Sequence, residues 1–119
     1  MTKITQAFTF EAAHRLPNVP EGHRCARMHG HSYRVELTIG GAVDAHTGWI
    51  VDFYEMERVF APVLERLDHH CLNEVEGLEN PTAENIAAWI WHRAKPGLPG
   101  LTAVKLYETP MSWAEYAGD

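Results

Sequence analysis

Two segments of alternating apolar and polar residues constrain this chain most, because period-two alternation is typical of a β-strand with one buried face. They cover residues 3–13 and 31–39 and predict two strands. His14 continues the apolar side of the first strand, and His29 and His31 share the parity of the second. The apolar positions are Ile4, Phe8, Phe10 and Ala12 in the first strand and Tyr33, Val35, Leu37 and Ile39 in the second.

An amphipathic helix is predicted after Asp52, with apolar residues three and four apart between positions 56 and 67. Asp52 and Glu55 have the spacing of a capping box, which predicts where this helix begins. Pro62 predicts a kink or a later start, because an interior proline costs about 3 kcal/mol. The following segment, 68–80, is polar and turn-like.

A second helix is predicted with Asn80 or Thr82 as its N-cap and its end at Pro96. Two further strands are predicted over residues 101–108 and 112–117. The order is strand, strand, helix, helix, strand, strand (ββααββ). This order predicts an α+β domain in which a four-stranded antiparallel sheet carries two helices on one face.

Length and charge limit the function classes. The 119 residues predict a single domain, 1–119, with a small core that an oligomer would help to bury. Ten basic against 16 acidic residues give a net charge of −6, which argues against nucleic acid or an anionic membrane as partner. With no apolar leader and no long apolar run, we expect a cytoplasmic protein whose two cysteines are free thiols.

Three histidines form a candidate metal site. Antiparallel pairing of the first two strands would bring His14 beside His29 and His31, and Gly30 leaves room for close backbone approach. Three imidazoles with a vacant fourth position are typical of catalytic zinc. Taken alone, His14 is more often a hydrogen-bonding residue at a strand end.

Cys25 lies in a long loop, four residues before His29. An isolated cysteine is usually a small buried apolar residue. Beside Arg24, Arg27 and a zinc ion its thiolate would be favoured, and it could act as a general base on a carbon acid. In the competing interpretation Cys25 is a fourth ligand and closes the metal site.

Two acidic positions complete the candidates. Asp68 and His69 follow the first helix, where either a polar helix end or a proton-shuttling Asp-His pair fits, and His70 fits the spacing equally well. As sequence neighbours, Asp68 and His69 are expected to reach a shared substrate or thiol rather than to meet as a helical pair. Glu108 has the apolar parity of its strand, so it is either a surface residue or an anchor for the N–H groups of a heterocycle.

These motifs together resemble, in order, the signatures of the 6-pyruvoyl-tetrahydropterin synthase family, above all its bacterial queuosine (7-deazaguanine) branch. The resemblance spans nearly the whole chain. The matching motifs are Phe10-Glu11-Ala12-Ala13-His14-Arg15-Leu16, Cys25-x-x-x-His29-Gly30-His31, Leu67-Asp68-His69, Asn80-Pro81-Thr82-x-Glu84-Asn85 and Glu108-Thr109.

The resemblance implies a tunnelling fold (T-fold), in which three subunits join their sheets into a barrel and two trimers stack into a hexamer with active sites at subunit interfaces. It implies Zn²⁺ on the three histidines and Cys25 as general base. It implies that Asp68 and His69 complete a proton relay from a neighbouring subunit, and that Glu108 anchors a pterin ring.

The implied substrate is 7,8-dihydroneopterin triphosphate, and the implied products are 6-carboxy-5,6,7,8-tetrahydropterin, acetaldehyde and triphosphate. The resemblance places Thr82 and Ala83 where backbone groups meet the pterin. Arg15, Arg24 and Arg27 are our candidates for triphosphate contacts, with solvated surface as the alternative. The rival functions are a pyruvoyl-type synthase, an aldolase-like or epimerase activity, and a non-catalytic zinc-binding module.

Overall fold

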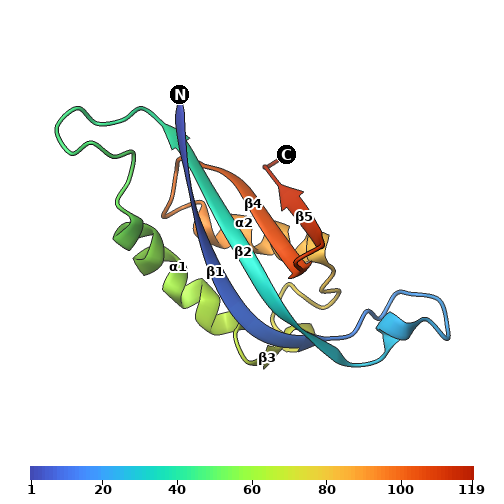
Figure 1. The fold of residues 1–119 in the computed structure, drawn as a ribbon. Helices are drawn as coiled ribbons and strands as arrows, with labels where there is room; N and C mark the ends of the chain where they lie inside the picture. Colours follow the sequence, from blue (N-terminus) through green and yellow to red (C-terminus); the bar gives the residue numbers. More distant parts are fainter.

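The computed structural model describes all 119 residues as one long sheet with a layer of two helices (Figure 1). The strand pair β1–β2 is much longer than the other elements and extends beyond the helices at both ends. In chain order the elements are β1 (Thr2–His14), the 3₁₀ turn η1 (Arg24–Ala26), β2 (His29–Gly41), α1 (Phe53–Leu67), β3 (His70–Cys71), the 3₁₀ turn η2 (Leu72–Glu74), α2 (Ala83–Ala94), β4 (Leu101–Thr109) and β5 (Ser112–Tyr116).

The sheet has the strand order β3-β1-β2-β4-β5. β1 and β2 pair antiparallel without interruption, from Thr2 opposite Gly41 to His14 opposite His29. Both helices pack on the same face of this sheet (Figure 1), which confirms the predicted α+β layers. The alternating pattern predicts this face correctly, because Phe10, Tyr33 and their apolar neighbours of the same parity form the core with the helices.

The predicted count of four strands is wrong, since the sheet has five. The additional strand, β3, pairs parallel to β1 through only two residues, with Ala12 opposite His70 and Ala13 opposite Cys71. Two residues are too few to show alternation, so residues 68–80 look like a polar turn in the sequence. This short strand fixes the chain after α1 against the end of β1 that carries His14.

The start of α1 differs in part from its prediction. Asp52 is the N-cap, and its carboxylate accepts a hydrogen bond from the Tyr54 N–H at 3.0 Å. Glu55 does not complete a capping box, because its carboxylate accepts instead from the Arg58 guanidinium at 2.9 Å. The helix begins at Phe53 and continues through Pro62, so a later start is also wrong.

The second helix begins as the sequence predicts. Thr82 is its N-cap and accepts a hydrogen bond from the Asn85 N–H at 3.2 Å. A side-chain oxygen at this position satisfies one of the free N–H groups of the first turn. Neither helix is long and apolar enough to span a membrane.

Candidate metal centre and active-site cleft

The three predicted histidines converge at one end of the β1–β2 ladder. His14 and His29 are direct cross-strand partners, and His31 lies two residues further along the same face. Their ring centroids are separated by 4.6 Å for His14–His29 and by 5.1 Å for each of the other two pairs. One nitrogen from each ring lies within 4.8 Å of the other two. The predicted meeting of three imidazoles is therefore confirmed.

Gly30 permits this convergence. A Cβ atom at this position would lie 3.3 Å from the carbonyl oxygen of Ala12, closer than most such contacts. The absence of a side chain lets β1 and β2 approach closely between the two ligands of β2. The predicted close approach of the backbone is confirmed.

Two backbone carbonyls set the orientation of the rings. The Nδ1 atom of His14 lies 2.8 Å from the carbonyl oxygen of Pro81, and that of His29 lies 2.7 Å from the carbonyl oxygen of Arg27. A carbonyl only accepts hydrogen bonds, so Nδ1 carries the proton and Nε2 keeps its lone pair. Metal-binding histidines usually donate their second N–H in this way. The sequence gives no signal for either carbonyl.

Two of the converging histidines have a buried nitrogen without a hydrogen-bond partner. His14 is 1% exposed, and its Nε2 has no hydrogen-bond partner. The Nε2 of His31 lies 3.3 Å from a Glu108 carboxylate oxygen, but the contact lacks the geometry of a hydrogen bond. Burial, above all, lowers the pKa of both His14 and His31. Converging imidazole nitrogens form a donor set that suits a divalent transition-metal ion, Zn²⁺ among them.

Cys25 and Glu108 share a cleft with two of the histidines. The cleft has a volume of about 460 Å³. The turn η1 fixes Cys25, whose N–H donates to His23 Nδ1 at 3.0 Å and whose carbonyl accepts from the Leu16 N–H at 2.8 Å. The lining residues are Arg24, Cys25, His29, His31, Glu108, Thr109 and Ser112.

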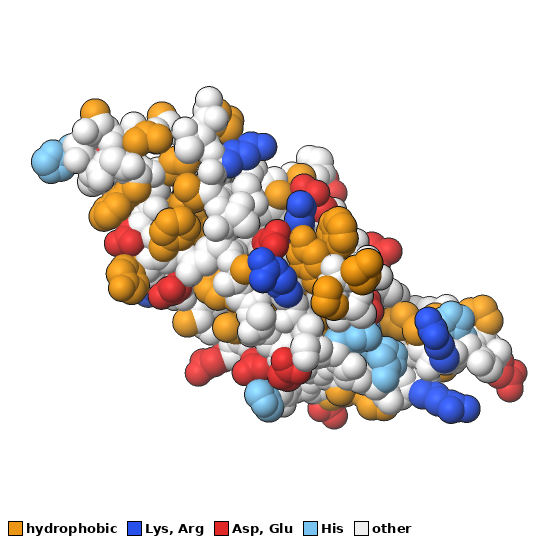
Figure 2. Space-filling view, viewed as in Figure 1, with side chains coloured by type: hydrophobic (Ala, Val, Ile, Leu, Met, Phe, Trp, Pro, Cys, Tyr) orange, Lys and Arg blue, Asp and Glu red, His pale blue; other side chains and the backbone are white.

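The site is open on the side of this cleft. The Cys25 thiol is not among the atoms that lie within 4.8 Å of one another in the histidine cluster. The histidines form this group without the thiol. Figure 2 shows histidine side chains at the surface beside the arginine-bearing loop between β1 and β2. The cleft thus offers two imidazoles, a separate thiol and a carboxylate to one small ligand, and His14 is in ring contact with both of these imidazoles.

Asp68 and His69 meet directly, although not as a helical pair, because both lie beyond the end of α1. His69 Nδ1 lies 3.0 Å from Asp68 Oδ1. The contact is possible because His69 adopts a left-handed backbone with φ of 61°, which turns its ring back toward the preceding residue. The Glu11 N–H donates a hydrogen bond to the Asp68 carboxylate. This bond, and secondly the contact with His69, lowers the pKa of Asp68.

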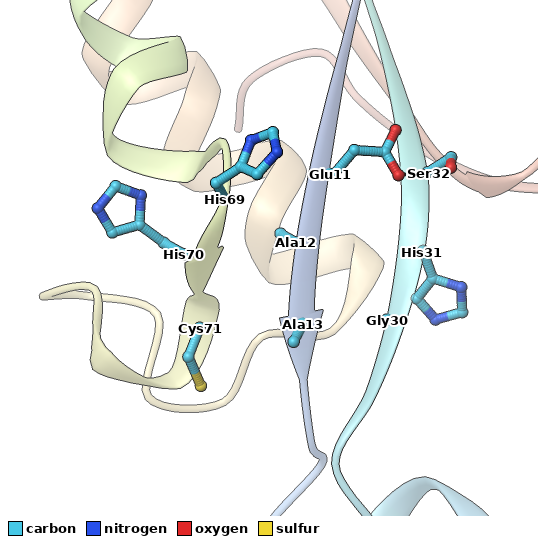
Figure 3. A pocket seen from close by; sticks show the side chains of 9 residues that line it. All are labelled: Glu11, Ala12, Ala13, Gly30, His31, Ser32, His69, His70 and Cys71. Atoms are coloured by element: carbon cyan, nitrogen blue, oxygen red, sulfur yellow. Dashed lines mark hydrogen bonds between the residues drawn. The ribbon is translucent and has the colours of Figure 1, made fainter.

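His69 lines a different hollow from that of Cys25, and His31 lines both hollows. The hollow of His69 has a volume of about 550 Å³ and lies over the β3–β1–β2 surface, where Glu11 and Ser32 are joined by a hydrogen bond of 2.6 Å. In Figure 3, His69 leans toward β1 from the turn just before β3, whereas His31 projects on the far side of β2. A single chain does not bring Asp68 and His69 into the cleft of Cys25, so their proposed role requires a second subunit.

The residues predicted to contact the substrate lie near the histidine cluster, at the start of α2 and in the loop between β1 and β2. Thr82 uses its hydroxyl as the cap of α2, and Ala83 packs against the core. They follow Pro81, whose carbonyl holds His14, so the start of α2 adjoins the histidine cluster. Arg27 is exposed and contributes its carbonyl to His29, whereas Arg24 lines the cleft.

The comparison with known proteins decides the family. The profile of the family described as 6-pyruvoyl tetrahydropterin synthase matches residues 3–119. The chain belongs to this family. Its T-fold is also that of the 6-pyruvoyl tetrahydropterin synthase of Caenorhabditis elegans, with a TM-score of 0.92, 26% identity and coverage of 99% of this chain and 96% of the other. The predicted fold is therefore confirmed.

Curated relatives carry different activities within the family. The chain is 41% identical to the 6-carboxy-5,6,7,8-tetrahydropterin synthase of Synechocystis, over 95% of this chain and 91% of the relative. It is 34% identical to the dihydroneopterin monophosphate aldolase of Pyrococcus furiosus, over 87% of this chain and 83% of the relative. The relatives thus share one family and differ in the reaction that their names give.

Proposed function

We propose that this protein is a zinc-dependent 6-carboxytetrahydropterin synthase of queuosine biosynthesis, acting in the cytoplasm as a hexamer. It converts 7,8-dihydroneopterin triphosphate to 6-carboxy-5,6,7,8-tetrahydropterin, acetaldehyde and triphosphate. The observation that carries the proposal is the convergence of three imidazoles, two of them with an unpaired buried nitrogen, beside a cleft that holds a thiol. The name of the Synechocystis relative supports the choice of product.

In this proposal His14, His29 and His31 hold the zinc ion and the other groups act on the substrate. When bound, Zn²⁺ supplies Lewis-acid polarisation of the hydroxyl groups on the substrate side chain. Cys25, as thiolate, removes a proton from the adjacent carbon, and Glu108 accepts hydrogen bonds from N–H groups of the pterin ring. General-base assistance of this kind contributes typically about 10²–10⁴-fold to the rate.

The Asp68–His69 pair supplies the second proton-transfer group. Asp68 holds the Nδ1 atom of the His69 imidazole, which leaves Nε2 directed elsewhere. Because the pair lies outside the cleft of its own Cys25, it serves the cleft of a neighbouring subunit. Thr82 and Ala83 present backbone groups to the pterin, while Arg24 and Arg27 contribute positive charge toward the triphosphate.

Product analysis with matched cysteine variants tests the proposal. Zinc-loaded protein is incubated with 7,8-dihydroneopterin triphosphate, and acetaldehyde, triphosphate and pterins are quantified. We expect acetaldehyde and the carboxypterin in equal amounts, with turnover of Cys25→Ala reduced by about 10²–10⁴-fold. Cys71→Ala is the matched control, because Cys71 is the other half-buried free thiol and lies on β3.

The alternative reactions give different products. Triphosphate release without acetaldehyde would show a pyruvoyl-type synthase and overturn the proposal. A two-carbon aldehyde that retains the phosphate groups would show an aldolase, the activity named for the Pyrococcus furiosus relative. Equal turnover of Cys25→Ala and Cys71→Ala would remove Cys25 from the role of general base.

A further inference from the structure

The side chain of Asn73 forms two hydrogen bonds with the backbone next to the metal centre. Asn73 lies in η2, and its Oδ1 accepts a hydrogen bond from the Arg15 N–H at 2.9 Å, while its Nδ2 donates to the Arg15 carbonyl at 2.9 Å. A neighbouring β-strand would likewise accept a hydrogen bond from the N–H of Arg15 and donate one to its carbonyl. The amide therefore continues the β1–β3 pairing beyond Ala13 and Cys71, where the short strand has already ended.

The same amide also reaches the segment that orients His14. Asn73 Nδ2 lies 3.5 Å from the carbonyl oxygen of Glu79, two residues before Pro81. The Pro81 carbonyl accepts the hydrogen bond from His14 Nδ1. Asn73 thus connects the residue that follows His14 in the chain with the segment that holds the ring of His14.

We infer that Asn73 is a positioning residue for the metal centre, because it fixes both the backbone and the ring partner of His14. The inference rests on the proposed metal-binding role of the three histidines. His14 is the most buried of the three, so its Nε2 can reach a shared metal ion only if the strand end and the Pro81 segment keep their spacing. Groups that orient a ligand from outside typically change metal affinity by about 10–100-fold when they are lost.

Two substitutions disrupt the hydrogen bonds of the Asn73 side chain in different ways. Asn73→Asp has the same shape and keeps an acceptor for the Arg15 N–H. It places an oxygen where Nδ2 now donates, so that this oxygen faces the carbonyl oxygens of Arg15 and Glu79. Asn73→Ala removes all of these contacts. Should Asn73→Ala fail to fold, the isosteric Asn73→Asp decides the test.

The experiment measures zinc affinity of the metal-free full chain by competition with a chromogenic chelator, without any substrate. We expect both variants to bind zinc about 10-fold more weakly than the parent. The visible absorption of the Co²⁺-substituted protein should also change in band position or intensity, because the ligand geometry is altered. Asn18→Asp is the matched control, since Asn18 is exposed, makes no side-chain hydrogen bond and receives the same charge change.

The outcomes separate this inference from the proposed function. If the parent protein does not bind zinc, the proposed metal centre is wrong and the inference is lost with it. If the parent binds zinc and Asn73→Asp binds with the parent's affinity and cobalt spectrum, the positioning role alone is overturned. An equal loss of affinity in Asn18→Asp would likewise overturn it, because the effect would then come from charge.

Discussion

Replacing Tyr33 by Phe should stabilise the metal-free protein. Tyr33 is 0% exposed, stacks on Phe10 at a centroid distance of 4.9 Å and touches the rings of His14 and His31. Its hydroxyl oxygen is buried without a hydrogen-bond partner. Burial, with the nearby Glu108 carboxylate, raises the pKa of this hydroxyl far above its usual range, so it stays protonated and uncharged.

The expected gain follows from the unpaired hydroxyl. A buried polar group without a partner costs about 1–3 kcal/mol, and Tyr33→Phe removes this group while keeping the ring. An unfolding entropy of about 2.1 cal/mol/K per residue gives about 0.25 kcal/mol/K for 119 residues. The melting temperature should therefore rise by about 4–12 °C.

Thermal unfolding followed by circular dichroism measures this shift in zinc-free protein. Tyr54→Phe is the control, because Tyr54 is 78% exposed and its hydroxyl is not buried. Its melting temperature should equal that of the parent. A Tyr33→Phe protein that melts at or below the parent temperature would refute the reasoning, since it would show that the hydroxyl is hydrogen-bonded in solution, for example to an enclosed water molecule.

Three further outcomes are expected. Because burial lowers the pKa of His14 and His31 below 6.5, the unfolded chain binds more protons than the fold in mild acid. The free energy of unfolding of zinc-free protein, measured with urea, should therefore fall as the pH decreases below about 6.5, by up to about 1.4 kcal/mol per pH unit for each histidine, and a flat profile would contradict this. Gly30→Ala should lower the free energy of unfolding in urea by about 1–3 kcal/mol and weaken zinc binding, because the new Cβ crowds the Ala12 carbonyl. If the variant is as stable as the parent, β1 and β2 can move apart at this point without cost. Thr82→Ala should lower the free energy of unfolding by about 1 kcal/mol through the lost cap, whereas Thr82→Ser should restore it; an equal loss in both would argue against capping.

Short-range patterns account for the parts of the fold that the sequence predicts. The alternation in β1 and β2 identifies their buried face, and the three- and four-residue spacing identifies both helices, because these periods reflect which side chains face the core. The convergence of His14, His29 and His31 follows from antiparallel pairing of consecutive strands. The predictions fail where a pattern is too short or where a side chain has two possible partners. β3 pairs through only two residues, and Glu55 binds Arg58 instead of completing the predicted capping box.

The sequence by itself determined the layered α+β architecture, the strand pair and the identity of the three converging histidines, since each depends on residue spacing along one or two neighbouring elements. Only the tertiary structure decided which ring nitrogens are free, because Pro81 and Arg27 act through carbonyls that every residue carries. It also decided that Asp68 and His69 meet, through a left-handed backbone at His69. Contacts made by the backbone, or by segments distant along the chain, leave no pattern in residue types, so they appear only when the chain is folded.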